Sequence, residues 1–283
     1  ANFTRSVFLM QPAVSSVNIS KVTSENVHEV SDLVAVEIPL EIRIIYGKGS
    51  DRQKKSISVI MRTPGNDFEL AAGFLITEGI VKGFSDILFI RYCEDAENVV
   101  NVDIKEDVII ELKTAERNFY TSSGCGICGK TSIDAVKYYA NGRIESDVFF
   151  SRDLISSLPK IIYTEQNVFK YTGGLHAAAL FNSDGELMLI REDVGRHNAT
   201  DKLIGAAAAL NLLPLNNYLL LLSGRAGFEL LQKAAMAGVG VVASVGAPSS
   251  LAIELASECN ITLIGFLRDN RFNIYTVPSK IKI

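Results

Sequence analysis

Short apolar segments alternate with segments of helical length through the C-terminal half of the chain, and this alternation restricts the fold more than any other feature. Strands are expected at residues 176–181, 187–190, 218–222, 239–244 and 261–266. Helix-length connections separate the last three, as in parallel sheets, whereas the short turn Ser183-Asp184-Gly185 joins the first two as a hairpin. The pattern predicts an α/β domain whose mixed sheet is mostly parallel.

The N-terminal half predicts a smaller, mainly β domain, which makes the whole chain α+β. Strands are expected at residues 34–46, 56–61, 87–93, 99–104 and 108–112, the first two as a hairpin. Asn66 and Glu69 have the spacing of a capping box, so we expect a helix to begin there. Residues 1–25 are expected to form a strand or an arm, to which no role is assigned. The predicted segments are a small N-terminal α+β domain at 1–117, a mobile loop at 118–131 and a larger α/β domain at 132–283.

Composition and charge exclude several classes of function. Hydrophobic residues make up 48% of the 283 residues and charged residues 21%, which is typical of a globular protein without a long disordered tail. The formal net charge is -4 with no basic run, which argues against a nucleic-acid partner. Two uncharged stretches, 203–224 and 234–253, contain Asn, Pro or Ser and resemble buried helix and strand rather than membrane spans. Since no signal-peptide core follows Ala1, we expect a cytoplasmic protein without a membrane partner.

Two of the four cysteines form a close pair in the Gly-rich segment Gly124-Cys125-Gly126-Ile127-Cys128-Gly129. The cysteines, at positions 93, 125, 128 and 259, make no disulfide framework, and a reducing cytoplasm keeps them as thiols. Lys130 and a helix expected to begin near residue 131 or 132 follow the pair, and both favour the thiolate form. The glycines permit a loop that presents sulfur to different partners. The pair is therefore expected to be reactive.

Three chemical interpretations of the pair remain open, besides that of two unreactive thiols in a loop. A structural zinc site needs four ligands, so the pair would need two more. The remaining candidates, at no recognisable spacing, are Cys93, Cys259, His28, His176 and His197. A thioredoxin-like oxidoreductase has this spacing, but its pair follows the first strand of a βαβ unit, whereas a hydroxyl-rich loop precedes this one. A persulfide carrier holds sulfur on one thiolate and yields it to an acceptor while the second thiol assists.

Three expected strands end in turns that can hold an anion. The turns are Ser223-Gly224-Arg225-Ala226-Gly227, Gly246-Ala247-Pro248-Ser249-Ser250 and Leu267-Arg268-Asp269-Asn270-Arg271. In a parallel sheet these turns lie at one edge, where backbone N–H groups and helix N-termini bind phosphate. Arg225, Arg268 and Arg271 add charge and a planar surface. The sequence predicts a phosphate or nucleotide site here, and the alternative is ordinary turns with solvated arginines.

Two histidines are expected near these turns. His176 opens an apolar strand, and His197 precedes Asn198, an expected helix N-cap. Each histidine alone is more often a packed core or cap residue than a catalyst. Asp193 and Arg196 beside His197 make a polar cluster, which indicates a site.

Four motifs stand in a specific order along the chain. They are ELAAGFLITEG at residues 69–79, GCGICG at 124–129, TGGLHAAA at 172–179 and EDVGRHNA at 192–199. Together with Ser223-Gly224-Arg225 and residues 265–271, they resemble the formate dehydrogenase accessory sulfurtransferase family, FdhD/NarQ. The resemblance extends from about residue 30 to the end of the chain.

The resemblance implies a sulfur carrier, or sulfurtransferase, with Cys125 as the persulfide-bearing residue and Cys128 as its helper. It implies that sulfur passes from a cysteine desulfurase to the molybdenum cofactor, bis(molybdopterin guanine dinucleotide), before insertion into a formate dehydrogenase apoenzyme. The resemblance also implies that one segment forms part of the cofactor site. This segment consists of Phe266, Leu267, Arg268, Asp269, Asn270 and Arg271. The expected site also includes the strand-end residues Ser223, Gly224, Arg225, His176 and His197.

The resemblance also implies a homodimer and a three-layer C-terminal domain with the cytidine-deaminase-like fold. The zinc signature of the deaminases, His-x-Glu with Pro-Cys-x-x-Cys, is missing. Ala178 stands at the Glu spacing after His176, and Gly124 precedes Cys125. We therefore expect neither deaminase activity nor a protein-bound metal.

Overall fold

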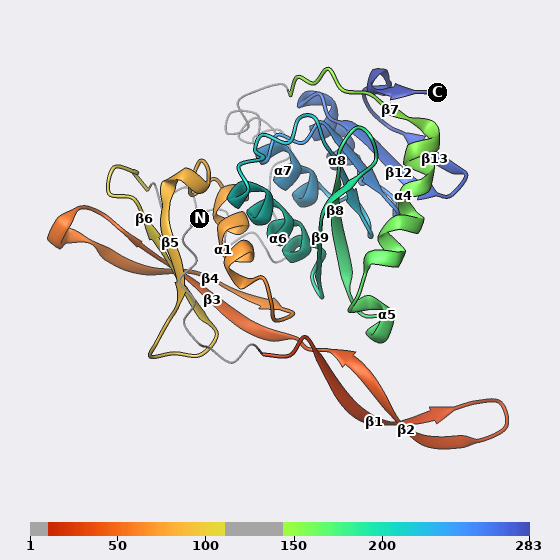
Figure 1. Cartoon of the computed structure of the whole chain (residues 1–283), viewed down its shortest axis with the longest axis horizontal. Coiled ribbons are helices and arrows are strands. Elements are labelled where there is room, and N and C mark those ends of the chain that lie inside the picture. The colour runs from red at the N-terminus through yellow and green to blue at the C-terminus, as the bar shows by residue number, and fades with distance from the viewer. Residues whose placement is uncertain (1–10, 111–143) are drawn as a thin grey trace.

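A computed structural model describes residues 11–110 and 144–283 of the chain (Figure 1). Two sheets with their helices form the body of the protein, and a two-stranded hairpin extends from it. Cys125, Cys128 and the loop expected over residues 118–131 lie outside the described residues. The strand expected at 108–112 is described only as far as residue 110, and residues 108–110 are not in a strand.

The N-terminal sheet is four-stranded, with the order β4-β3-β6-β5. Its strands are β3 (Ile38–Tyr46), β4 (Gln53–Arg62), β5 (Ile87–Tyr92) and β6 (Val99–Ile104). β3 pairs antiparallel with β4, which confirms the predicted hairpin, and parallel with β6. Alternate side chains of β3 and β6, such as Ile42 and Val102, are fully buried in a cluster that includes helix α1 (Asp67–Thr77).

Helix α1 begins where it was predicted, but the capping-box interpretation is wrong. Asn66 has a left-handed backbone conformation, with φ of 58°, and its side chain caps no N–H group of the helix. Asp67 accepts two hydrogen bonds from the guanidinium of Arg62, at 2.9 and 2.8 Å. Glu69 forms an ion pair with Arg191 of the other sheet. Contacts between distant segments therefore replace the local capping pattern at this helix.

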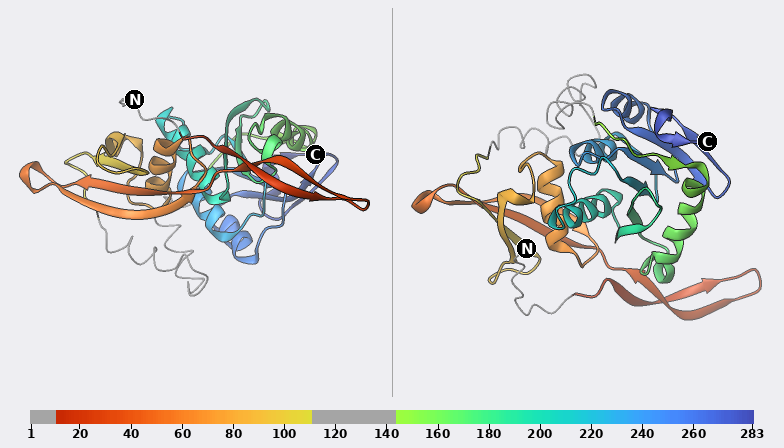
Figure 2. Two further views of the ribbon diagram at one scale, coloured as in Figure 1. Left: turned by 90° about the horizontal axis from the view of Figure 1, so that it is seen from below. Right: turned by 45° about the horizontal axis from the view of Figure 1, so that its top comes forward.

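The first described strands, β1 (Val14–Val22) and β2 (Val27–Ala35), form a separate antiparallel hairpin. The sequence predicted one strand over residues 34–46, but the chain leaves β2 after Ala35 and enters β3 at Ile38, so the two strands belong to different sheets. Figure 1 and the right-hand view of Figure 2 show the hairpin extending away from the body. Most of its side chains are exposed.

The C-terminal sheet has six strands in the order β13-β12-β11-β10-β8-β9. They are β8 (His176–Phe181), β9 (Leu187–Asp193), β10 (Leu219–Leu222), β11 (Val241–Ser244), β12 (Thr262–Arg268) and β13 (Arg271–Ile274). β10, β11 and β12 are parallel, and the predicted hairpin of β8 and β9 makes the sheet mixed. The description of the sheet as mostly parallel is wrong, because β8–β10, β8–β9 and β12–β13 pair antiparallel. The last of these pairs forms because the chain turns at Asp269 and Asn270 instead of entering a helix.

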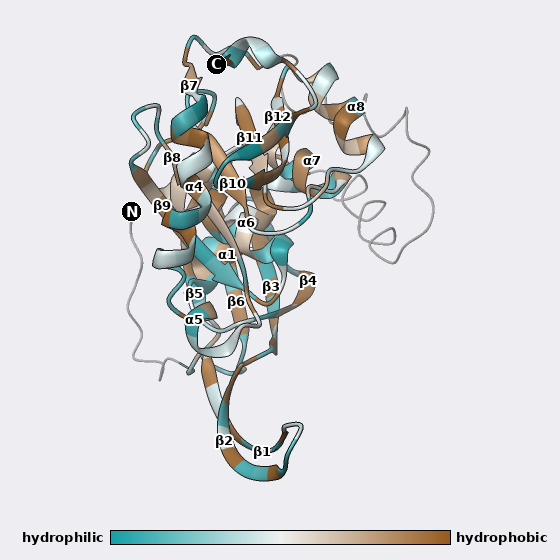
Figure 3. Ribbon diagram, turned by 90° about the vertical axis from the view of Figure 1, so that its right-hand side faces the viewer, coloured by the Kyte–Doolittle hydropathy of each residue, from teal (hydrophilic) through white to brown (hydrophobic). Residues whose placement is uncertain are grey.

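Helices cover both faces of the C-terminal sheet (Figure 1). α4 (Arg152–Glu165) packs on the face where Phe181 and Leu221 are buried. α6 (Arg196–Ala209), α7 (Phe228–Met236) and α8 (Ser250–Glu258) cover the face where Leu180 and Leu222 are buried. Figure 3 shows hydrophobic residues along the central strands β10 and β11. The predicted mixed α/β architecture is confirmed, while its likeness to the cytidine-deaminase-like fold stays a prediction.

Short elements complete the described fold. They are η1 (Gly49–Asp51), η2 (Phe84–Asp86), β7 (Phe150–Ser151), α5 (Phe169–Thr172), η3 (Pro278–Lys280) and β14 (Ile281–Lys282). Of the helices in residues 11–110 and 144–283, none combines the length and the apolar character needed to cross a bilayer.

Two glycines allow helices α1 and α6 to cross in close contact. A Cβ atom on Gly73 would lie 1.8 Å from the carbonyl oxygen of Asp201, and one on Gly205 would lie 1.9 Å from that of Glu69. Either side chain would force the two helices apart. One hydrophobic cluster extends through this contact from β3 to β12, so the two sheets share a core.

Candidate functional site

The turns that were expected to bind an anion meet at one edge of the C-terminal sheet. β10, β11 and β12 are parallel, so their carboxyl ends lie together, and the antiparallel β8 brings its first residue, His176, to the same edge. β9 ends there at Asp193, which pairs with His176, and α6 follows with Arg196 and His197. We refer to the predicted residues at this edge as the strand-end site, which consists of His176, His197, Ser223, Gly224, Arg225 and residues 266–271.

The turn after β10 is fixed by hydrogen bonds to the neighbouring strands. The Ser223 N–H donates to the carbonyl of Ala177 at 3.0 Å, and Ser223 Oγ accepts from the Ala177 N–H at 2.8 Å. Ser244 Oγ donates to the Gly224 carbonyl at 2.6 Å. A Cβ atom on Gly246 would lie 2.8 Å from the main chain of this turn, so the next turn needs glycine at that position. Ser244 was missed by sequence reasoning, although a buried polar residue at the end of an apolar strand signals a turn contact.

The turn after β12 exposes an aromatic ring. Phe266 has a positive φ of 52°, and 45% of the residue is exposed. A β-bulge between Gly265 and Arg268 accompanies this uncommon backbone conformation. Leu267, in contrast, is fully buried among the side chains that face α4, so it packs the core rather than lines the site. Strained positions of this kind are concentrated at binding and active sites.

Positive charge at the strand-end site comes from three exposed arginines, Arg225, Arg268 and Arg271. Nη1 of Arg268 donates to the carbonyl of Val245 at 2.7 Å, which holds this side chain against the turn after β11. Asp269 and Asn270 are exposed at the tip of the hairpin between β12 and β13. The three turns therefore present more positive than negative side chains to solvent at this edge.

The two predicted histidines lie close enough for their charges to interact. The ring of His176 packs over Gly224, where a Cβ atom would lie 3.2 Å from its Nδ1. Burial lowers the pKa of His176 below its ordinary value, and the charges of Arg196 and His197 lower it further. Nε2 of His197 lies 2.9 Å from Oε2 of Glu229, in the first turn of α7. Sequence reasoning missed Glu229, because acidic residues are common in the first turn of any helix.

We expect His176 to titrate with a pKa below the ordinary value of about 6.5, so that its ring is neutral at pH 7. The half-buried ring is poorly solvated as a cation, and Arg196 adds an unfavourable positive charge. An NMR titration of the imidazole C–H signals measures this pKa, with His176→Gln used to assign the signal. Arg196→Gln should raise the midpoint, because it removes a positive charge. A wild-type midpoint at or above the ordinary value would contradict this description of the site.

Asp193, expected to belong to a polar site, is fully buried and surrounded by donors. Its carboxylate accepts from the N–H groups of Thr63 at 3.1 Å and Gly195 at 2.9 Å. Nδ2 of Asn198 donates to it at 2.8 Å, and Nζ of Lys202 lies 2.7 Å away. Asn198 is not the predicted N-cap, because α6 begins two residues earlier. Asp193 therefore joins the end of β4 to α6 and has no remaining capacity for a ligand.

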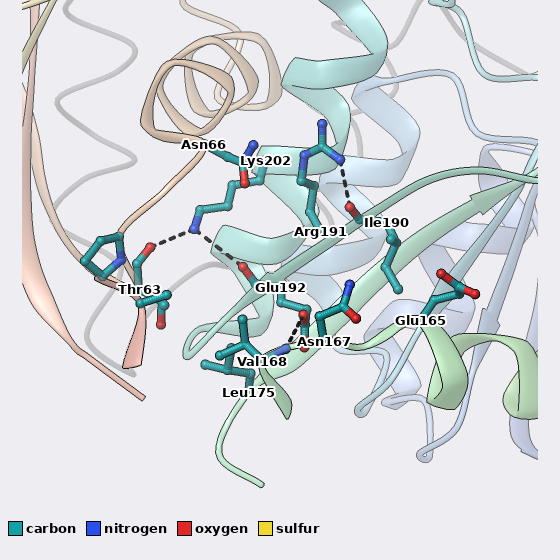
Figure 4. A pocket seen from close by; sticks show the side chains of 12 residues that line it. Thr63, Asn66, Glu165, Asn167, Val168, Leu175, Ile190, Arg191, Glu192 and Lys202 are labelled. Carbon is teal, nitrogen blue, oxygen red and sulfur yellow. Dashed lines mark hydrogen bonds between the residues drawn. The ribbon is translucent and has the colours of Figure 1, made fainter. Parts of the chain in front are cut away.

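A pocket of about 270 Å³ lies apart from the strand-end site, between the end of β4, the end of α4 and β9 (Figure 4). Its cationic groups are occupied, since Lys202 pairs with Asp193 and Arg191 with Glu69. The carboxylate of Glu192 accepts N–H groups at the start of α5, at 3.0 and 2.9 Å. None of the described strand-end residues lines this pocket. We therefore do not expect the ligand of the strand-end site to bind in this pocket.

Residues 11–110 and 144–283 contain no group of three or more His, Cys, Asp or Glu side chains that could hold a metal ion. Cys93, which follows β5, and Cys259, which follows α8, are both buried. The zinc interpretation of Cys125 and Cys128 depends on residues outside this part of the chain.

The sequence profile of the FdhD/NarQ family matches residues 35–282. The chain belongs to this family. The family prediction from the four motifs is thereby confirmed. The match begins at the last residue of β2, so most of the exposed hairpin precedes the part shared with the family profile.

Relatives in the FdhD/NarQ family are named sulfur carrier protein FdhD. The one from Streptomyces avermitilis is 48% identical over 261 residues, which cover 89% of this chain and 90% of the relative. The one from Picrophilus torridus is 45% identical over 252 residues, which cover 89% and 93% of the two chains. The one from Sulfurisphaera tokodaii is 42% identical over 268 residues and covers 95% of this chain and 99% of its own.

A solved structure shares the fold of this FdhD/NarQ chain. It is the crystal structure of a protein from Desulfotalea psychrophila that is described as a formate dehydrogenase accessory protein. The TM-score is 0.74 at 25% sequence identity, and the match covers 96% of this chain and 100% of the other. The likeness therefore includes both sheets rather than one of them.

Proposed function

We propose that this chain carries persulfide sulfur from a cysteine desulfurase to the molybdenum cofactor, bis(molybdopterin guanine dinucleotide), for a formate dehydrogenase apoenzyme. The main support is membership of the FdhD/NarQ family, whose relatives are named sulfur carriers, in a chain that contains the Cys125 and Cys128 pair. The solved relative is described as an accessory protein of formate dehydrogenase. The reaction needs reduced thiols, so we place it in the cytoplasm. The resemblance to the family suggests a homodimer as the working form.

In the proposed reaction, the Cys125 thiolate attacks the outer sulfur of the desulfurase persulfide. A new S–S bond forms on Cys125, the S–S bond on the desulfurase breaks, and its electron pair returns to the desulfurase cysteine. In delivery, a nucleophile of the acceptor bonds to the outer sulfur, and Cys125 leaves as a thiolate. Cys128 assists by giving its proton to that thiolate. Neither step needs an external oxidant or reductant, because the attacking nucleophile supplies the electron pair of each new bond, and in delivery that nucleophile is the acceptor itself.

We assign acceptor binding to the strand-end site. The guanine dinucleotide part of the cofactor carries phosphate groups, for which Arg225, Arg268 and Arg271 supply positive charge. The exposed ring of Phe266 offers a flat apolar surface on which a guanine base can stack. The hydrogen-bonded turn at Ser223 supplies a rigid frame beside these groups.

Sulfur loading of the wild-type protein tests the proposed function. Incubation with a cysteine desulfurase, cysteine and a persulfide-reactive probe should add the probe to Cys125, located by mass spectrometry of peptides. Cys93 and Cys259 are internal controls that should stay unlabelled, because both are buried. Labelling confined to those two residues, or no labelling, would count against a sulfur carrier. Catalytic reduction of insulin disulfides without any persulfide would instead favour the thioredoxin-like interpretation.

A further inference from the structure

Helices α6 and α7 are joined by two polar contacts, one helical turn apart. His197 and Asp201 are four residues apart on α6, and Glu229 and Lys233 are four residues apart on α7. This spacing puts each pair on one face of its helix. Nε2 of His197 lies 2.9 Å from Oε2 of Glu229, and Nζ of Lys233 lies 2.9 Å from Oδ2 of Asp201. The two contacts therefore fix the position of α7 relative to α6 at two points, one helical turn apart.

The deeper contact is enclosed by the protein. Besides its contact with Asp201, Nζ of Lys233 lies 2.9 Å from Oε1 of Glu78 and donates to Oγ1 of Thr77 at 3.0 Å. Burial opposes the charge of Lys233, but Asp201 and Glu78 outweigh it and raise the pKa of Lys233 above its ordinary value. Thr77 and Glu78 stand at the end of α1. This contact therefore fixes α7 against both α1 and α6.

The other contact lies at the strand-end site and is open to solvent. The side chain of His197 is 30% exposed and that of Glu229 is 58% exposed. The hydrogen bond from His197 lowers the pKa of Glu229, and Lys233 and Arg196 add to this effect. The charge of His197 also affects His176, whose ring packs over Gly224. Glu229 therefore holds the imidazole of His197 within range of a charge interaction with His176, which itself lies against the turn after β10.

We propose that Glu229 is a positioning residue of the strand-end site. Its carboxylate accepts the Nε2–H of His197 and orients a ring that is protonated on both nitrogens in the complex, so that Nδ1–H donates a hydrogen bond to a phosphate group of the acceptor. The contact with Glu229 occupies Nε2, and Nδ1 of His197 has no partner among the described residues. A carboxylate behind one ring nitrogen fixes the orientation of the ring and of the other nitrogen. This inference rests on the proposed function, in which the strand-end site binds the guanine dinucleotide.

Calorimetric titration with guanosine diphosphate tests this role, since the probe carries a guanine base and two phosphates. Glu229→Ala should weaken binding by about tenfold, a loss like that caused by removing the group that orients a metal-bound histidine. Glu229→Gln should retain most of the affinity, because its amide oxygen still accepts a hydrogen bond from the ring. The matched control is Glu254→Ala, an exposed glutamate of α8 that should bind the probe as the wild type does.

The ring nitrogen signals of His197 in a long-range ¹H–¹⁵N spectrum give a second measurement. They should shift in Glu229→Ala and stay near the wild-type positions in Glu229→Gln and Glu254→Ala. Unchanged affinity or unchanged ring signals in Glu229→Ala would overturn the positioning role while leaving the proposed acceptor site in place. Failure of the wild-type protein to bind guanosine diphosphate would overturn the acceptor site itself, and the positioning role with it.

Discussion

Replacing Cys125 with alanine is expected to reduce sulfur transfer to the background level. Cys125 is the residue assigned to hold the transferred sulfur through an S–S bond, and alanine has no sulfur with which to form that bond. The measurement is transfer of labelled sulfur from a desulfurase and cysteine, followed by activation of a formate dehydrogenase that lacks sulfur on its cofactor. We expect Cys128→Ala to load sulfur but to deliver it more slowly, since its thiol assists release.

The matched control for this experiment is Cys93→Ala. Cys93 is a buried thiol that follows β5 in the N-terminal sheet, so its loss should leave sulfur loading unchanged. Sulfur loading of Cys125→Ala equal to that of the wild type would contradict the assignment of Cys125. Full loading of Cys125→Ala together with none in Cys128→Ala would move the persulfide to Cys128.

Replacing Asp193 with alanine is expected to cost about 3–5 kcal/mol of unfolding free energy. The carboxylate balances the charge of Lys202, whose ammonium is 2.7 Å away in a side chain that is 2% exposed. Without it, that charge stays buried, and the N–H groups of Thr63 and Gly195 lose their acceptor. Denaturant unfolding followed by circular dichroism measures the loss.

The exposed pair of Arg152 and Asp153 supplies the control for this measurement. Their charged atoms lie 3.2 Å apart, but the side chains are 63% and 88% exposed, so Asp153→Ala should change stability little. Asp193→Asn should lie between the two variants, because it keeps the volume and part of the hydrogen bonding but loses the charge. A loss in Asp193→Ala no larger than in Asp153→Ala would show that Asp193 does not hold β4 and α6 together.

The strands of the C-terminal sheet were predictable because each is a short apolar run between turn residues. The runs at 218–222 and 239–244 correspond to β10 (Leu219–Leu222) and β11 (Val241–Ser244). Central parallel strands are buried on both faces, so they need a continuous apolar sequence. The N-terminal hairpin was not predicted, because β1 and β2 keep most side chains in solvent and show no clear alternation of polar and apolar residues.

The gathering of the three turns was also predictable, because parallel strands place their carboxyl ends at one edge. The side chains that contact the site residues could not be predicted from the sequence. Glu229 contacts His197 from another helix, and Lys233 contacts Glu78, which is 155 residues away in the chain. Spacing along a helix shows which side chains share a face, but it does not show which helix that face meets. The chemistry of Cys125 and Cys128 rests on the sequence and the family.

The close contact of α1 and α6 at Gly73 and Gly205 couples the unfolding of the two sheets. The main chains touch where Gly73 and Gly205 meet, and one apolar cluster continues from the first sheet into the second. Neither half can lose its structure without exposing the interior of the other, so melting should be one cooperative event. The same coupling makes the N-terminal sheet a poor candidate for exchange between proteins as an independent module. In contrast, the β1–β2 hairpin contributes little to this interior, so its sequence can diverge without cost to the rest of the chain.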